Sequence, residues 1–330
     1  MDGPTGASMT SYIEAIREAL IEEMDRDPSV VLLGEDIGLY GGAFKLSAGL
    51  RDRFGAERVI DTPIAESAIV GAAVGAALAG LRPVAELQFI DFIANGYNQV
   101  VNMAAKLRPR FDQAVPLVLR GPSGGGVAAG PFHSQNVEVP FVHAGLTVVA
   151  PATAADAKGL LLAAIRSPDP VLYLEHKKLY RSIKEELPPG DPLVPIGKAA
   201  LRRGGDDLAI ITYGAMVHLA LEAAARLEHE DEVDSSVLDL RTLHPLDTAA
   251  ILERVQRCGR VVLLHEDGRT AGLAGELAAL IAEQAFEYLD APLLRVTAPD
   301  GPVPYAADLE RSFLPQLEDL LAAARRLLEY

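Results

Sequence analysis

The sequence predicts an α/β protein with two domains, each a mostly parallel sheet flanked by helices. Its 330 residues exceed the size of one ordinary domain, and with 49% hydrophobic residues it can bury two cores. Short apolar runs alternate with helical patterns in both halves, as in sheets built with crossover helices. A stretch rich in proline and glycine separates the halves. We expect a flexible leader at 1–9, a first domain at 10–185, a linker at 186–200 and a second domain at 201–330.

The first half begins with a helix whose apolar residues Ile13, Ile16, Leu20 and Met24 share one face. A second helix is expected from Thr62, which can cap it, and Pro63, which suits a first turn. Thr153 is expected to cap a third. The expected strands lie at 30–33, 59–60, 84–87, 116–120, 147–150 and 171–175, and the helices after the first at 63–80, 92–107 and 153–165.

The second half repeats the alternation without a recognisable internal repeat. We expect strands at 208–212, 236–238, 261–265 and 293–296, and helices at 216–227, 247–255, 272–285 and 308–328.

Composition excludes several classes of function. A formal net charge of −16 argues against nucleic acid as a partner and favours basic protein surfaces. Cys258 is the single cysteine, which rules out an intrachain disulfide and suits a reducing compartment. There is no apolar run of membrane-spanning length and no secretory signal, so we expect a cytoplasmic protein that does not contact a membrane. A Walker loop, a dinucleotide glycine fingerprint and a His-Glu-x-x-His zinc motif are also absent.

Glu66 stands at the start of a helix made largely of glycine and alanine. A lone glutamate there is more often a solvated first-turn residue favoured by the helix dipole. The bare helix, with Gly71 and Gly75, would let backbone of another element or subunit approach closely. The surrounding motifs therefore decide between the two interpretations.

Three segments carry a family resemblance: Asp61-Thr-Pro-Ile-Ala-Glu66, the stretch from Gly80 to Phe92, and Phe132-His133-Ser-Gln135. They resemble the β subunit of thiamine-diphosphate-dependent 2-oxo acid dehydrogenase components, with the branched-chain type most similar. The resemblance runs from Leu33-Gly-Glu35-Asp36 to Pro299-Asp300. It implies a transketolase-like pyrimidine-binding domain followed by a transketolase C-terminal domain.

The resemblance implies a role for each matching residue at 35–92. The residue matching Glu66 hydrogen-bonds the aminopyrimidine ring of the cofactor, which helps the cofactor lose the proton of its thiazolium carbon. A carboxyl group desolvated in an apolar cleft has a raised pKa and can supply the shared proton. The residues expected around the cofactor are Glu35, Gln88 and Phe92, together with the backbone of Ile64 and Ala65.

His133 lies in a glycine-rich polar loop, where functional residues concentrate. The resemblance gives its counterpart a role in handling protons on the substrate and the incoming lipoyl group. Phe132 stands where relatives carry Tyr, His or Gln, so we expect an apolar wall that favours branched substrates. The stretch from Asn136 to Pro140 departs from the family pattern, which leaves the backbone path after Gln135 open.

The cofactor site is incomplete in this sequence. No Gly-Asp-Gly motif is present, so the magnesium that anchors the diphosphate is expected on an α subunit of an α2β2 heterotetramer. Some relatives also bind potassium, which here would involve Leu117, Ala164, Ile165, Ser167 and Asp169. Ser167 replaces a more usual Asp, and an ordinary helix-ending turn is the alternative.

The expected activity is oxidative decarboxylation of a 2-oxo acid with acyl transfer to a lipoyl group. The expected partners are the α subunit and a lipoyl acyltransferase core, which would dock on an acidic patch that includes Glu310, Glu318 and Asp319. The alternatives are a pyruvate or acetoin dehydrogenase β subunit, a transketolase-like half-chain and a non-catalytic scaffold subunit. A transketolase would need basic phosphate-binding residues around 121–135, where only Arg120 is near.

Overall fold

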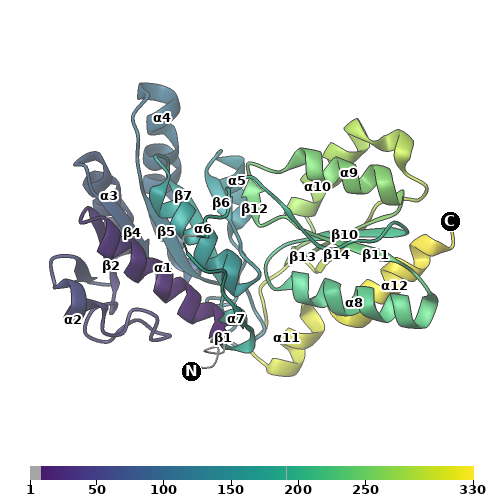
Figure 1. Ribbon diagram of the computed structural model, residues 1–330, viewed down its shortest axis with the longest axis horizontal. Coiled ribbons are helices and arrows are strands. Elements are labelled where there is room, and N and C mark those ends of the chain that lie inside the picture. Colours follow the sequence, from purple (N-terminus) through teal and green to yellow (C-terminus); the bar gives the residue numbers. More distant parts are fainter. Residues whose placement is uncertain (1–8, 191) are drawn as a thin grey trace, which may run out of the picture. The chain divides into compact units, whose positions relative to one another are not determined.

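The computed structural model describes residues 9–190 and 192–330 (Figure 1). The expected leader at 1–9 therefore lies outside the described residues except for Met9. The described residues form two compact units, one within 9–122 and 153–196 and the other within 123–152 and 197–330. Residues 123–152 thus group with the C-terminal half of the chain. The boundaries at 185 and 200 stay predictions.

The first unit contains five strands in the order β7-β5-β4-β2-β3, in which β5, β4, β2 and β3 are parallel to their neighbours. A short antiparallel pair, β1 with β8, completes its strands. The strands are β1 (Met9–Ser11), β2 (Val30–Glu35), β3 (Val59–Thr62), β4 (Arg82–Glu86), β5 (Val118–Ser123), β7 (Val171–His176) and β8 (Lys184–Glu186). The helices are α1 (Tyr12–Arg26), α2 (Leu50–Phe54), α3 (Glu66–Leu78), η1 (Ile90–Gly96), η2 (Gln99–Ala104), α4 (Ala105–Phe111), α6 (Ala154–Arg166) and α7 (Leu179–Ser182).

Helices α1 and α6 run side by side in the first unit (Figure 1). The predicted apolar face of α1 is confirmed, because Ile13, Ile16, Leu20 and Met24 are all buried. Thr153 caps α6 as predicted, its hydroxyl accepting the backbone N–H of Asp156. Apolar periodicity and a capping residue therefore identified both helices.

The expected start of α3 was wrong. Thr62 is the last residue of β3 and lies in register with Glu35, so the chain is still extended there. The helix begins at Glu66, after Pro63, Ile64 and Ala65. Because Thr62 pairs with the neighbouring strand, it does not cap the helix. Glu66 therefore occupies the first helical position.

The single helix expected at 92–107 was also wrong. The chain forms a 3₁₀ segment, η1, then a π-helical segment, η2, before α4 begins. Gly96 packs so closely on α3 that a Cβ there would lie 2.9 Å from Cγ2 of Val70. Close packing against α3 thus accompanies irregular helical turns in place of a regular helix. Irregular turns of this kind often occur at functional sites.

The second unit is built on a five-stranded sheet with the order β14-β13-β10-β11-β9, parallel except for β9. Its strands are β9 (Ala200–Arg203), β10 (Leu208–Thr212), β11 (Ser235–Asp239), β13 (Val261–Gly268) and β14 (Leu294–Ala298). It also contains β6 (Thr147–Val149) and β12 (Thr242–His244), which pair with each other in antiparallel orientation. Its helices are α5 (Glu138–His143), α8 (Met216–Asp231), α9 (Thr248–Cys258), α10 (Leu273–Gln284), η3 (Phe286–Tyr288), α11 (Ala307–Phe313) and α12 (Leu317–Leu328).

Helices α9 and α10 cover one face of this sheet, and α8 and α12 cover the other (Figure 1). The four predicted strands are confirmed, and β9 was missed because it overlaps the expected linker. The helix expected at 308–328 is divided into α11 and α12, because Pro315 cannot continue a helix. The predicted fold class, two mostly parallel sheets flanked by helices, is confirmed.

Candidate active site

The predicted site residues of the first unit follow three adjacent parallel strands. Glu35 ends β2 in register with Thr62, the end of β3, while Gly34 lies in register with Glu86, the end of β4. The carboxyl ends of the three strands thus lie at one edge of the sheet. Ligands of open α/β sheets bind at this edge. Ile64, Ala65 and Glu66 directly follow β3, and Gln88 follows β4.

Glu35 and Glu66 interact electrostatically at this edge. Burial, assisted by the negative charges of Glu66, Asp36 and Glu86, raises the pKa of Glu35 to about 6. Only 6% of Glu35 is exposed, and its Oε1 is buried without a hydrogen-bond partner among the described residues. A buried carboxyl oxygen that lacks a partner is a place for a ligand donor.

Glu66 is held by a residue that the sequence did not single out. Its Oε2 accepts a hydrogen bond from Nδ2 of Asn95 at 3.1 Å. Asn95 lies in η1, three residues after the predicted site residue Phe92. The sequence signal that could have identified Asn95 is its polar side chain in the segment that follows Gln88.

The other predicted cofactor contacts offer apolar and half-buried surface. Ile64 is 78% exposed, a high value for an isoleucine, and it lies in the irregular turn between β3 and α3. Ala65, Gln88 and Phe92 are half-buried. An exposed apolar side chain beside two carboxylates suits a flat, partly polar ring.

Asp61 connects this turn to the segment after β2. Its carboxylate accepts the backbone N–H of Gly38 at 2.5 Å and of Leu39 at 3.2 Å, and it pairs with Arg51 at 2.7 Å. Asp61 therefore stabilises the backbone around Glu35, a structural role within the conspicuous Asp61-to-Glu66 motif.

His133 and Phe132 belong to the second unit, in a loop closed by its own backbone. The N–H of Gly124 donates to the carbonyl of Gln135 at 3.0 Å, and the N–H of His133 donates to the carbonyl of Gly130 at 3.2 Å. His133 is half-buried, whereas 59% of Phe132 is exposed. Each unit therefore presents its own predicted residues, with the carboxylates in the first and the histidine in the second.

The backbone path after Gln135, left open by the sequence, leads into α5. Nδ2 of Asn136 donates to Oε1 of Glu266 at 3.3 Å. Glu138 begins α5 and accepts the hydroxyl of Tyr213. Burial, assisted by the charge of Asp267, raises the pKa of Glu138 to about 8. The unusual sequence is accommodated by polar contacts within the second unit.

The residues proposed for potassium already accept protein donors. Nη1 of Arg82 donates to the carbonyls of Ile165 at 2.8 Å and Ser167 at 3.1 Å. The carbonyls of Leu117 and Ala164 accept the N–H groups of Val171 and Ser167. Asp169 pairs with Arg108 at 2.6 Å. A carbonyl oxygen has a second lone pair, so a cation would have to share these oxygens with a guanidinium.

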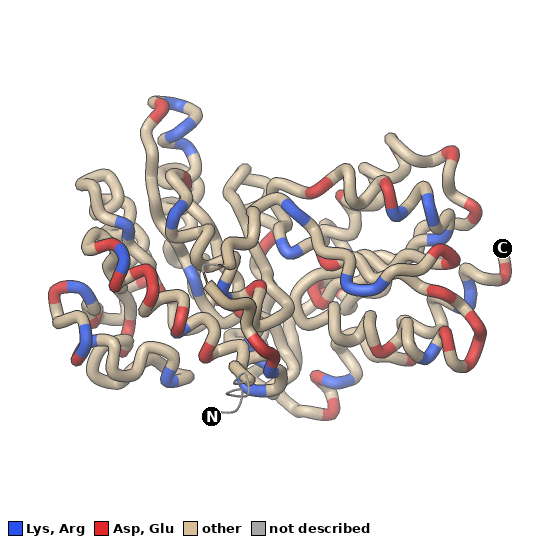
Figure 2. Tube along the Cα trace, in the orientation of Figure 1, with Lys and Arg blue, Asp and Glu red and all other residues tan. Residues whose placement is uncertain are grey.

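Arg120 is not available to a phosphorylated substrate. It is 2% exposed and pairs with both Glu86 and Glu175 inside the first unit. In the part of the chain that the structure describes, acidic and basic residues are interspersed and form no continuous basic stripe (Figure 2). This arrangement weakens the transketolase alternative, which needs basic residues around the loop.

Of the three carboxylates named for the expected acidic patch, Glu318 and Asp319 are exposed and Glu310 is buried. Glu310 is only 4% exposed, Glu318 pairs with Arg226, and Asp319 accepts the N–H of Gln316 as part of a capping box. The expectation that Glu310 is a surface residue was wrong, because its carboxylate is used inside the second unit.

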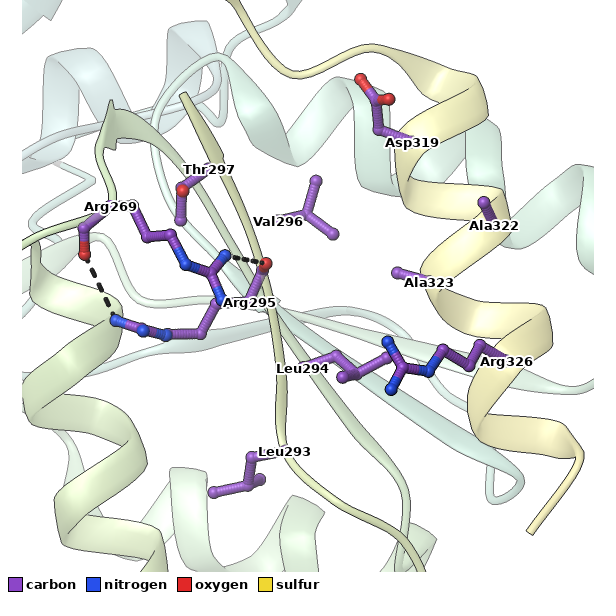
Figure 3. A pocket seen from close by; sticks show the side chains of 10 residues that line it. All are labelled: Arg269, Leu293, Leu294, Arg295, Val296, Thr297, Asp319, Ala322, Ala323 and Arg326. Carbon is purple, nitrogen blue, oxygen red and sulfur yellow. Dashed lines mark hydrogen bonds between the residues drawn. The ribbon is translucent and has the colours of Figure 1, made fainter. Parts of the chain in front are cut away.

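A cavity of about 620 Å³ lies between β14 and α12, and none of the predicted site residues lines it (Figure 3). Arg269 and Arg295 each donate to the backbone carbonyl of the other, and Arg326 lies on the α12 side. A smaller cavity of about 300 Å³ is lined by Gln135, Asn136 and Glu266, next to the His133 loop. Among the described residues, no group of three or more His, Cys, Asp and Glu side chains could hold a metal ion. None of the described helices combines the length and apolar character needed to cross a bilayer.

Comparison with known proteins gives consistent similarities over the whole chain. Residues 8–183 match the family profile described as "Transketolase, pyrimidine binding domain", and residues 197–320 match "Transketolase, C-terminal domain". The chain is 50% identical to the 2-oxoisovalerate dehydrogenase subunit beta of Bacillus subtilis (strain 168), over 98% of this chain and 100% of the relative. It is 44% identical to the pyruvate dehydrogenase E1 component subunit beta of the same organism, with the same coverage.

A solved structure titled "Split gene transketolase, inactive beta4 tetramer" shares the fold. Its TM-score is 0.78 at 23% identity, covering 98% of this chain and 99% of that one. At this identity the likeness concerns the fold.

Proposed function

We propose, from the premise that the chain belongs to the family of β subunits of 2-oxo acid dehydrogenase E1 components, that it supplies the aminopyrimidine side of a thiamine diphosphate site. The proposed reaction is the oxidative decarboxylation of a branched-chain 2-oxo acid with acyl transfer to a lipoyl group. The observation that carries the proposal is the pair Glu35 and Glu66 at the carboxyl edge of the first sheet. Glu35 has a raised pKa, and its buried Oε1 has no hydrogen-bond partner among the described residues.

The residues present fit the ring half of this cofactor. Glu66 would hold a proton shared with a ring nitrogen, and Glu35 would offer its free Oε1 nearby. Ile64, Ala65, Gln88 and Phe92 would line the ring. When bound, thiamine diphosphate supplies the nucleophilic carbon that attacks the 2-oxo group, and it also accommodates the electron pair that stays behind when carbon dioxide leaves.

The residues of the second unit would act on the substrate. His133 would hold or release a proton at the substrate or at the lipoyl sulfur, and Phe132 would exclude water and contact the aliphatic tail. The exposed position of Phe132 agrees with contact to a ligand. A branched chain is favoured by this apolar side chain and by the 50% identical relative. Pyruvate and acetoin remain the alternative substrates.

An α subunit is proposed to hold magnesium and the diphosphate, in an α2β2 assembly. Helix α3 supports such an interface, since its solvent-facing positions Ala68, Ala72 and Gly75 are small and exposed. A Cβ at Gly75 meets nothing within 4 Å. A Gly75→Leu variant should therefore fold but fail to co-purify with the α subunit, whereas Gly75→Ala should fold and assemble more nearly as wild type.

The proposal is tested by calorimetric titration with thiamine diphosphate and magnesium. The chain alone should bind negligibly, and the reconstituted α–β complex should bind stoichiometrically and reduce a dye acceptor when given a 2-oxo acid. Tight binding by the chain alone would contradict a divided site, and a complex inactive with every 2-oxo acid would favour a scaffold subunit.

Two further proposals concern a partner protein and the cellular location. We propose a lipoyl acyltransferase core as a partner and the cytoplasm as the location. The net charge of −16 supports docking on a basic surface, which should weaken as salt is raised. Docking that is insensitive to salt would reject an electrostatic contact.

Potassium at Leu117, Ala164, Ile165, Ser167 and Asp169 stays a prediction. A cation that binds only the folded protein raises its melting temperature. Replacing sodium by potassium in thermal unfolding tests this. Equal melting temperatures would indicate that Arg82 alone occupies the site.

A further inference from the structure

The loop that carries His133 is held by a carboxylate from the end of the chain. Glu310, on α11, accepts the backbone N–H of Gly126 through Oε1 at 3.0 Å and that of Ala128 through Oε2 at 2.7 Å. Both oxygens thus bind one short stretch of backbone. The side chain is 4% exposed, so water competes little for these hydrogen bonds.

Glu266, at the end of β13, holds the flanks of the same loop. Its Oε1 accepts the N–H of Gly125 at 2.6 Å and the side-chain amide of Asn136 at 3.3 Å. The stretch 124–136 is therefore bound by carboxylates on both sides of Phe132 and His133. We call Glu266 and Glu310 together the loop clamp.

The backbone conformation of the loop makes it dependent on external support. Gly124, Gly126, Ala128 and Gly130 all have positive φ, and at Ala128 (φ 56°) a non-glycine residue adopts the left-handed region. Such a conformation persists when the surroundings over-determine it. Glu310 binds the N–H of Ala128 itself.

Side chains next to Glu310 leave the loop little room to move. A Cβ on Gly125 would lie 3.0 Å from Cδ1 of Leu314, and one on Gly130 would lie 2.3 Å from Cδ1 of Tyr305. Packing and hydrogen bonding therefore restrict the same segment. Both charged oxygens of Glu310 accept hydrogen bonds from neighbouring backbone N–H groups of this restricted segment.

We infer that Glu310 is a positioning residue for His133: its carboxylate holds residues 126–128 so that the histidine is presented in a single orientation. This inference rests on the proposed function of His133. Misplacement of a reacting group by about 1 Å can reduce a rate about 100-fold, so the effect on turnover should be large although Glu310 does not touch the substrate.

The experiment uses the reconstituted α–β complex and a double-mutant cycle. Glu310→Gln keeps the size of the side chain but replaces one acceptor by a donor that opposes a backbone N–H. We expect it to lower kcat about 10- to 100-fold. Glu310→Asp, which keeps both acceptors, should recover part of the rate. Glu287→Gln removes the same charge from an exposed position of the second unit and should leave kcat unchanged.

The decisive comparison is made in a His133→Ala background. If Glu310 acts through His133, Glu310→Gln should cause no further loss beyond about twofold there, since residues that act as a unit are non-additive. A purely structural role would give the same loss in both backgrounds and would overturn the inference. So would a kcat of Glu310→Gln within about threefold of wild type.

Hydrogen exchange separates this inference from the proposed function. Glu310→Gln should speed exchange of the amides at 125–130 in the complex and leave α3 unchanged; unchanged exchange at 125–130 would overturn the clamp. A wild-type complex inactive on every 2-oxo acid refutes the proposed function, whereas the exchange result still reports on the clamp. A His133→Ala complex with full activity overturns the positioning inference and leaves decarboxylation by the complex standing.

Discussion

The carboxylate of Glu66 and the side-chain amide of Asn95 are joined by a hydrogen bond of 3.1 Å between the first turn of α3 and the 3₁₀ segment η1. The bond uses one carboxylate oxygen, Oε2, and orients the other. This relationship gives the central carboxylate of the proposed site a defined direction. Four predictions concern it and its surroundings.

Glu66→Gln should preserve folding and assembly but remove most of the activity. The amide has the same shape but cannot share a proton with the cofactor ring. General acid–base contributions are about 100- to 10,000-fold, which sets the expected loss of kcat in the reconstituted complex. Glu57→Gln, at an exposed position of the same unit, is the control. A kcat within about threefold of wild type would contradict the role assigned to Glu66.

Asn95→Ala should lower kcat by about 10- to 100-fold, because a hydrogen bond to a charged group contributes about 1.5–3 kcal/mol. The effect should be smaller than that of Glu66→Gln, since the carboxylate itself remains. The matched control is Asn98→Ala, which loses only an exposed contact with Asn102. Equal activity of the two variants in steady-state assays would show that the orientation of Glu66 does not depend on Asn95.

Glu35 should make stability depend on pH in a specific window. Its pKa is about 6 in the folded chain against an ordinary value of 4.5, so between these values the folded state keeps a proton that the unfolded state has lost. The free energy of unfolding should therefore fall as the pH rises from 4.5 to 6, by about 1–2 kcal/mol from this group. In Glu35→Gln that decrease should be absent, while Glu57→Gln should retain it. Urea titrations of the three proteins across this range measure it, and parallel curves for wild type and Glu35→Gln would refute the assignment.

Phe132→Gln should change the ranking of substrates. An apolar wall favours a branched tail by about 1–3 kcal/mol for each methylene, so wild type should prefer 2-oxoisovalerate to 2-oxobutyrate and pyruvate. The variant should narrow this preference, whereas His133→Ala should reduce turnover of every substrate. The comparison requires kcat/KM values of the reconstituted complex. Pyruvate ranking first in wild type would remove the branched-chain preference and leave the dehydrogenase class intact.

Much of the fold could be predicted because the strands are short and apolar and are separated by segments that contain glycine and proline. The strand at 208–212 was predicted at its observed bounds. Two of the failures have their cause in long-range packing. Thr62 has the sequence of a helix cap, but its backbone pairs with Glu35 across the sheet. The helical segments from Ile90 are distorted by contact with α3, which no local pattern describes.

The candidate site could be predicted where it follows strand ends and motifs, as at Glu35 and Glu66. Residues that act through a tertiary contact could not. Asn95 is separated from Glu66 by 29 positions, and Glu310 from Ala128 by 182. Glu310 was even expected at the surface, as one of the carboxylates near the end of the chain. Its buried acceptors are visible only once the loop is folded against it.

The wide separation in sequence between Glu310 and the loop has a consequence for folding during synthesis on the ribosome. The loop emerges when little more than a third of the chain has been made, yet its two carboxylate supports follow 141 and 184 residues later, counted from Gly125 to Glu266 and from Gly126 to Glu310. Domains fold as units during synthesis, with N-terminal segments first. A nascent or prematurely terminated chain can therefore form the sheet edge with Glu35 and Glu66 while its histidine loop is still unrestrained. The carboxylate of Glu310 can hold this loop only after residue 310 has been synthesised, so chains that end before it cannot present the complete set of residues.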